Sequence, residues 1–189
     1  MYLIGITGKA GSGKDTVAQY LSKTYTMHRY SMAQPLKAML RVLGIDCDDR
    51  FTKETPHPMF GVSPRRMMQT LGTEWMRASI CRDGWLKLAE QRRQEGEQED
   101  LHGIVIPDIR FEDEAAWVRA KGGAIVHLYR PSLAPVEEHS SEHGVRYEVG
   151  QRDYGVVNGS TVEDLCRQVD VFMRSVQQRQ SKAQEAGAA

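Results

Sequence analysis

The stretch GITGKAGSGKDTVAQYL, residues 5–21, decides the expected fold. It overlaps the short, apolar, β-branched run YLIGIT at residues 2–7, which is typical of a buried strand. From Gly8 to Lys14 it then satisfies the spacing G-x-x-x-x-G-K, and apolar residues at helical spacing follow. Strand, glycine-rich loop and helix thus occur in the order that a phosphate-binding loop requires.

The loop has a clear physical logic. Glycine lets the backbone turn tightly, so that successive N–H groups point at phosphate oxygens. The following helix adds its free amides and the positive end of its dipole. Lys14 would bridge the β- and γ-phosphates of a nucleoside triphosphate.

Asp15 occupies the position that in such loops usually carries a Ser or Thr hydroxyl for Mg²⁺, and Thr16 comes one residue later. Aspartate is a hard oxygen ligand, so Asp15 could bind Mg²⁺ directly or through water, which leaves Thr16 for the α-phosphate. Asp15 could also turn away to hold loop or substrate groups, or simply complement the helix dipole as an N-terminal acid. The residues alone leave these interpretations open.

A second candidate acid follows the apolar run GIVIPD at residues 103–108. Asp108 would stand at the carboxyl end of a buried strand, where open α/β sheets bind ligands and phosphate-loop proteins keep a second magnesium-facing acid. Arg110 would face the same crevice. The alternative makes Asp108 the N-cap of a helix over 111–121; Pro107 and Arg110 favour the functional interpretation.

Several arginines suit the binding of a second anion. Arg65 and Arg66 fall in the first turn of a helix, where a cation opposes the dipole, so helix stability does not explain them. Arg77 and Arg130 adjoin loops. Phosphoryl transfer between two anions requires such cations, because charge spreads over the moving group.

The Trp85 ring could stack on a base, although core packing is the stronger interpretation.

Composition limits the partners. The 189 residues contain 25 basic and 25 acidic side chains, so no global positive field exists to hold a nucleic acid. No apolar run approaches the roughly 18–20 residues that span a bilayer, and the N-terminal residues lack the basic region of a signal peptide. Three widely spaced cysteines are typical of reduced thiols. We therefore expect a cytoplasmic protein that binds neither nucleic acid nor membrane.

The remaining sequence alternates strand-like and helix-like segments, which predicts a three-layer α/β/α fold around a parallel sheet. We expect one domain over 1–175 and a frayed, flexible tail over 176–189. Strands are predicted at 2–7, 28–32, 103–108, 124–129 and 154–158. Helices are predicted at 15–25, 34–43, 63–79 with a break near Gly72, 83–96, 111–121 and 161–177, and a loop at 44–62.

From about Leu3 to Met173 the chain resembles the phage-type deoxynucleoside monophosphate kinases of the P-loop kinase superfamily. The resemblance is carried by GKAGSGKDT, RRMMQTLGTEW, GWLKLA, IVIPDIRFEDEA, GAIVHLYRP and VVNGSTVEDL. The form GKDT is usual in that family, so Asp15 is consistent with a working loop.

The resemblance implies transfer of the γ-phosphoryl group of ATP to a deoxynucleoside 5′-monophosphate, with Mg²⁺, on a five-stranded parallel sheet of order 2-3-1-4-5. It also implies a substrate-binding segment over about 33–100 and a lid over about 130–150, and it leaves a homodimer open. A phage-encoded enzyme of this kind would work in the host cytoplasm. The implied residues are Gly11, Ser12, Gly13, Lys14, Asp15 and Thr16 for ATP; Lys14, Asp108, Arg110 and Arg130 for catalysis; Arg65, Arg66, Arg77 and Trp85 for the substrate; and Asp15 and Asp108 for the metal.

Two alternatives remain open. A related small-molecule kinase would act on dephospho-coenzyme A or a phosphorylated metabolite instead of a nucleotide. A regulatory module would bind ATP or GTP without transferring phosphate; the missing N-K-x-D guanine signature and the acceptor-side arginines argue against it. Which bases are accepted stays open as well.

Overall fold

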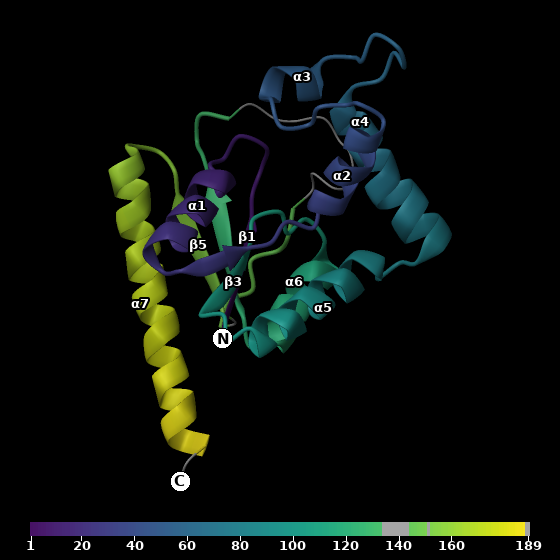
Figure 1. Ribbon diagram of the computed structural model, residues 1–189. Coiled ribbons are helices and arrows are strands. Elements are labelled where there is room, and N and C mark those ends of the chain that lie inside the picture. The colour runs from purple at the N-terminus through teal and green to yellow at the C-terminus, as the bar shows by residue number, and fades with distance from the viewer. Residues whose placement is uncertain (134–143, 151, 188–189) are drawn as a thin grey trace. The chain divides into compact units, whose positions relative to one another are not determined.

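The computed structural model describes residues 1–133, 144–150 and 152–187 (Figure 1). The chain forms two compact units, Met1–Arg29 with Glu99–Ala189, and Tyr30–Gln98. We call them the sheet unit and the helical unit. The segment 33–100, predicted to bind substrate, falls almost entirely in the helical unit. That role, and the organisation as one domain over 1–175, stay predictions.

The sheet unit contains five parallel strands in the order β2-β3-β1-β4-β5. The predicted parallel sheet and its order are therefore confirmed. Because all strands run in one direction, their carboxyl ends gather at one edge, which we call the carboxyl edge. The strands are β1 (Tyr2–Thr7), β2 (Met27–Arg29), β3 (Gly103–Ile106), β4 (Ala124–Tyr129) and β5 (Asp153–Val157).

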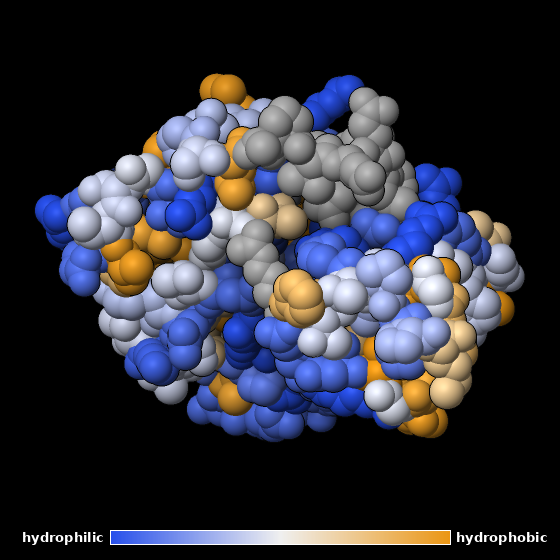
Figure 2. Space-filling view, turned by 90° about the horizontal axis from the view of Figure 1, so that it is seen from above, coloured by the Kyte–Doolittle hydropathy of each residue, from blue (hydrophilic) through white to orange (hydrophobic). Residues whose placement is uncertain are grey.

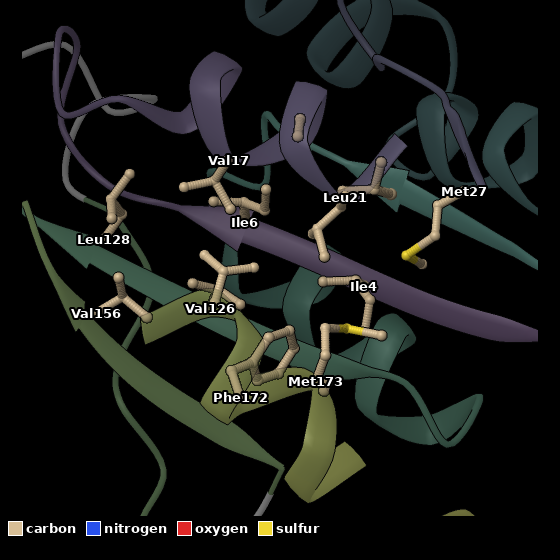
Figure 3. Close-up of a cluster of buried hydrophobic side chains, with 14 of the residues drawn as sticks. Ile4, Ile6, Val17, Leu21, Met27, Val126, Leu128, Val156, Phe172 and Met173 are labelled. Atoms are coloured by element: carbon tan, nitrogen blue, oxygen red, sulfur yellow. The ribbon is translucent and has the colours of Figure 1, made fainter. Parts of the chain in front are cut away.

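Helices cover both faces of this sheet, which confirms the three layers. Helices α1 (Lys14–Thr24) and α7 (Val162–Gly187) lie on one face, and α6 (Glu112–Ala120) lies on the other. Figure 3 shows the first interface, where Leu21 of α1 and Phe172 of α7 point toward Ile4 and Val126 of the sheet. These buried side chains fix the distance between β1 and α1, and so the shape of the loop between them.

Helix α7 extends past its predicted end. The sequence pattern predicted that the helix ends near Gln177, yet α7 continues to Gly187. The residues after Gln177 are mostly Gln, Lys, Ala and Glu, which have high helix propensity. They lack the apolar periodicity from which a helix was predicted elsewhere in the sequence. At this end α7 reaches the amino ends of the strands, where Tyr2 and Gln180 line one small hollow.

The helical unit contains α2 (Gln34–Val42), α3 (Arg50–Glu54), α4 (Pro64–Gln69), a π-helix (Thr70–Ile80) and α5 (Gly84–Gln98). The prediction of a loop over 44–62 was wrong at α3. The Asp49 carboxylate accepts a hydrogen bond from Thr52 N at 2.7 Å and so caps this short helix. The charged, turn-rich sequence around it concealed the capping residue.

The predicted break near Gly72 was also wrong, because the π-helix runs through this glycine. Its hydrogen bonds skip five residues, as between Cys81 N and Met76 O at 2.7 Å, so the apolar residues do not follow α-helical spacing. The Gly72 carbonyl accepts from the Trp85 indole Nε1 at 2.9 Å, and Trp85 is only 5% exposed. Trp85 therefore packs inside the unit, as the stronger interpretation held, and its contact with substrate stays a prediction.

Hydrophilic residues predominate on the face seen in Figure 2, where hydrophobic residues form several separate patches. Apolar residues scattered in this way are ordinary on a protein surface. Within the described residues, no helix is both long enough and apolar enough to cross a membrane. The three cysteines are free thiols, of which Cys47 is buried and the other two half-buried.

Candidate active site

The predicted phosphate loop, Gly8–Lys14, joins β1 to α1 at the carboxyl edge. Gly8 and Gly13 have φ angles of 147° and 103°, which favour glycine. A Cβ atom added at Gly8 would lie 2.4 Å from the Leu128 carbonyl oxygen, and one at Gly13 would lie 2.6 Å from Asn158 Nδ2. Both positions therefore require glycine for conformation and for space.

Lys14 opens α1, and its ammonium group lies over the loop. Its Nζ donates to the carbonyl oxygens of Gly8 at 2.6 Å and Lys9 at 2.8 Å. Ser12 is 1% exposed, and its hydroxyl has no hydrogen-bond partner among the residues that the structure describes. A buried hydroxyl that no described residue satisfies, a lysine on the carbonyls of the same loop and the amide end of α1 together fit a phosphate group.

Two residues from the ends of neighbouring strands contact this loop. Arg130, which follows β4, donates from Nη1 to the Gly11 carbonyl at 3.3 Å, so the structure brings this predicted residue to the loop. Asn158, which follows β5, donates from Nδ2 to the Ser12 carbonyl at 2.8 Å. The sequence reasoning missed Asn158 as a site residue; the only signal was its place as the last residue of a predicted strand at the same edge.

Asp108 lies in the turn after β3. This turn is held beside β1, because Ile109 N donates to the Ile6 carbonyl at 3.1 Å. The Glu114 carboxylate accepts from Arg110 N at 2.7 Å and from Phe111 N at 3.1 Å. Glu114 thus satisfies the amides of Phe111 and of the residue before it, and Phe111, not Asp108, is the N-cap of α6. The roles of Asp108 and Arg110 toward substrate and metal stay predictions.

Asp15 forms an ion pair with Arg29, the last residue of β2. The Asp15 side chain is 82% exposed, so the pair is worth little to stability and can open for another ligand. Among the residues that the structure describes, no three His, Cys, Asp or Glu side chains cluster as a metal site. Mg²⁺ that is bound together with a nucleotide needs only one or two protein carboxylates, so Asp15 and Asp108 remain chemically suitable candidates for its ligands. No sequence pattern pointed to Arg29.

The three arginines predicted for the acceptor lie in the helical unit. Arg65 donates from Nε to both carboxylate oxygens of Glu54, at 2.7 and 2.8 Å, and thereby ties α4 to α3. Arg66 lies 3.4 Å from a Glu74 carboxylate oxygen, and Arg77 Nη1 lies 3.5 Å from the carbonyl of Arg82. An acceptor phosphate would have to compete with the Glu54 carboxylate for Arg65 and with the Glu74 carboxylate for Arg66, and the substrate contacts of all three arginines stay predictions.

The lid was predicted over about 130–150, and its middle part, 134–143, lies outside the described residues. The segment that follows is fixed to the sheet unit by Asp153, whose side chain is 0% exposed. The Asp153 carboxylate accepts from Arg119 Nη2 at 2.6 Å and from Glu148 N at 2.9 Å, and lies 2.8 Å from His127 Nε2. We call this set of residues the Asp153 network.

Burial sets the protonation of this network. Burial lowers the pKa of His127, and its hydrogen bond to Asp153 opposes this only in part. Burial alone would raise the pKa of Asp153, but hydrogen bonds from Arg119, the Glu148 amide and His127 outweigh it and lower that pKa. In the native state His127 is therefore neutral at a pH where the unfolded chain already binds a proton.

Acidification should accordingly destabilise the protein. As pH falls through the ordinary His pKa of 6.5, the unfolded state takes up a proton that native His127 resists, so the free energy of unfolding decreases. The lowered pKa of Asp153 changes stability in the same direction, because its contribution to the free energy of unfolding is lost as pH falls below the ordinary Asp pKa of 3.8. Urea unfolding at pH 7.5, 6.5 and 5.5 should show the decrease, and His127→Gln should flatten it. Equal slopes in both proteins would contradict the assignment to His127.

Together, a five-stranded parallel sheet of this order and a glycine loop opening onto α1 define an α/β kinase of the P-loop class. The family model of deoxynucleotide monophosphate kinase matches residues 2–54 and 53–169. A relative from Acanthamoeba polyphaga mimivirus is 33% identical over 183 residues, which cover 89% of this chain and 94% of the relative. The chain therefore belongs to the deoxynucleotide monophosphate kinase family, as the resemblance predicted.

More distant proteins agree with this result. The deoxynucleotide monophosphate kinase of Enterobacteria phage T4 is 23% identical over 236 residues, covering 89% of this chain and 97% of that protein. Among solved structures, TT1252 from Thermus thermophilus has a TM-score of 0.50 at 17% identity, over 92% of this chain and 97% of that one. At this identity the likeness shows the fold alone.

Proposed function

We propose that the protein transfers the γ-phosphoryl group of ATP to a deoxynucleoside 5′-monophosphate, giving ADP and the deoxynucleoside diphosphate. The observation that carries the proposal is the loop Gly8–Lys14, with its lysine over the loop carbonyls and a buried Ser12 hydroxyl to which no described residue bonds. The T4 relative, named a deoxynucleotide monophosphate kinase, supports the choice of acceptor.

On the donor side, Gly11–Thr16 hold the triphosphate through backbone amides. Lys14 Nζ donates to the Gly8 and Lys9 carbonyls, and Arg130 Nη1 donates to the Gly11 carbonyl. Phosphate oxygens are stronger acceptors for these cations than neutral carbonyls are. Both side chains are therefore placed to exchange a loop carbonyl for a β- or γ-phosphate oxygen when ATP binds.

Asp15 and Asp108 are the candidate ligands for Mg²⁺, directly or through water. Bound Mg²⁺ would neutralise charge on the β- and γ-phosphate oxygens. To serve the ion, Asp15 would have to release Arg29, which an exposed ion pair permits at small cost. Arg29 would then be available to a substrate anion at the carboxyl edge.

On the acceptor side, Arg65, Arg66 and Arg77 bind the phosphate of the monophosphate, and Arg110 balances charge at the reaction centre. An acceptor phosphate oxygen is already ionised near neutral pH, so no strong general base is needed. Asp108 orients the reacting groups instead of taking a proton. Exclusion of water from the reacting groups is required, because ATP would otherwise be hydrolysed.

The proposal is tested by ADP release from ATP and Mg²⁺ over a panel of acceptors. Deoxynucleoside monophosphates should give turnover well above the acceptor-free rate, and ribonucleoside monophosphates in the same panel measure the sugar preference. Turnover only with dephospho-coenzyme A or a phosphorylated metabolite would favour the related small-molecule kinase. Binding of ATP with no turnover on any acceptor would favour the regulatory module.

A further inference from the structure

We propose that Asn158 is a positioning residue that sets the direction of a phosphate-binding amide in the loop. The inference rests on the proposed function, because it concerns how the same loop grips the triphosphate. Asn158 is the chain's only asparagine, and it lies immediately after β5. It reaches a residue 146 positions earlier in the sequence.

The backbone of Asn158 is fixed to the sheet. Its N donates to the Tyr129 carbonyl at the end of β4, at 2.7 Å. The preceding residue, Val157, is held by Gln168 of α7: Val157 N donates to Gln168 Oε1 at 2.9 Å, and Gln168 Nε2 donates to the Val157 carbonyl at 2.9 Å. The strand end is thus clamped on both sides, so the Asn158 side chain starts from a rigid base.

From this base the carboxamide engages one peptide group of the loop. Its Nδ2 donates to the Ser12 carbonyl at 2.8 Å, and it lies so close to Gly13 that an added Cβ there would be 2.6 Å away. In a trans peptide the C=O and the following N–H point in opposite directions. Holding the Ser12 carbonyl toward Asn158 therefore turns the Gly13 N–H away from Asn158, toward the interior of the loop.

The contact with Asn158 restricts rotation of the peptide group between Ser12 and Gly13. Gly13 has φ of 103° and no side chain, so little else prevents the peptide between Ser12 and Gly13 from rotating. A rotated peptide would present a carbonyl, not an N–H, to the phosphate oxygens. Because donors that are fixed in advance need no reorganisation when the anion binds, Asn158 should strengthen triphosphate binding without touching the nucleoside.

The test compares Asn158→Ala with the wild type by calorimetry, using ATP and inorganic tripolyphosphate, which has no base or sugar. A net hydrogen bond of about 0.5–1.5 kcal/mol corresponds to roughly a 2- to 10-fold change. We expect Asn158→Ala to raise the dissociation constants of both ligands by the same factor, within this range. It should also raise KM for ATP and leave KM for the monophosphate unchanged. Asn158→Asp, which opposes a carboxylate to the Ser12 carbonyl, should weaken both ligands further. The matched control is Ser160→Ala, since the Ser160 hydroxyl bonds Asp164 and not the loop.

The outcomes separate the possibilities. If Asn158→Ala bound ATP more weakly but tripolyphosphate as tightly as the wild type does, the proposal would be overturned, because Asn158 would then contact the nucleoside. Unchanged affinity for both ligands would overturn it as well. Selective ¹⁵N labelling of asparagine gives one pair of side-chain NH2 signals in the wild type, and this pair should shift with tripolyphosphate even if Asn158→Ala does not fold. A signal that does not respond would count against the proposal. A wild type that binds tripolyphosphate but phosphorylates no monophosphate would refute the proposed function alone.

Discussion

Replacing Lys14 with methionine should lower turnover at least about 100-fold while the protein stays folded. Methionine has a similar length, so the change removes the charge and the donors with little change in volume. Loss of one preorganised donor to a transferring group typically costs about 10²–10³-fold in rate. Lys14 is the only lysine side chain that the described structure places over the carbonyls of Gly8 and Lys9.

The measurement is ADP release at saturating ATP and monophosphate, together with thermal unfolding. The matched control is Lys23→Met, which removes an exposed lysine from the last turn of the same helix and should leave turnover unchanged. If the Lys14 variant turned over within twofold of the wild type, the loop would have no part in the reaction. A large loss of unfolding temperature would instead assign Lys14 to the fold.

Replacing Asp153 with asparagine should lower the free energy of unfolding by about 3–5 kcal/mol, the usual cost of removing one partner from a buried ion pair. Asparagine keeps the shape but not the charge, and it deprives the Arg119 guanidinium, 9% exposed, of its fully buried carboxylate, so that only the more exposed Glu148 carboxylate still pairs with it. The same change removes an acceptor from His127 and from the Glu148 amide. Four segments of the sheet unit meet at this carboxylate, so the cost should be global.

Urea unfolding measures the change, and Asp164→Asn is the control. Asp164 pairs with Arg167 on the surface of α7, where solvent screens the ion pair and its loss should cost little stability. The double variant Asp153→Asn with Arg119→Met should recover part of the stability, because it also removes the guanidinium that has lost its buried partner. A loss below 1 kcal/mol in Asp153→Asn would mean that the network contributes no net stability.

The sequence predicted what depends on local order. The loop from Gly8 to Lys14 followed from spacing, and the five strands from short apolar runs. Their order came from the family resemblance rather than from the residues. The π-helix was missed because its period differs from that of an α-helix, and α3 because one capping carboxylate was its main local signal.

The contacts that complete the site are long-range and carry no local pattern. Asn158 and Ser12 are 146 residues apart, and Asp153 and Arg119 are 34 apart. A polar residue at a strand end gives no indication of which carbonyl or guanidinium the fold brings to it. Asp15 illustrates the same limit: its position in the motif suggested a metal ligand, but its ion pair with Arg29 depends on where β2 ends.

The direction of α7 has a practical consequence for binding measurements. Because α7 starts at the carboxyl edge and Gln180 shares a hollow with Tyr2, both termini of the described chain are on the side of the sheet remote from the glycine loop. A biotin or affinity tag at either terminus would therefore attach the protein to a sensor surface on the side of the sheet opposite the glycine loop. Association and release of triphosphates would then be recorded without interference from the attachment point.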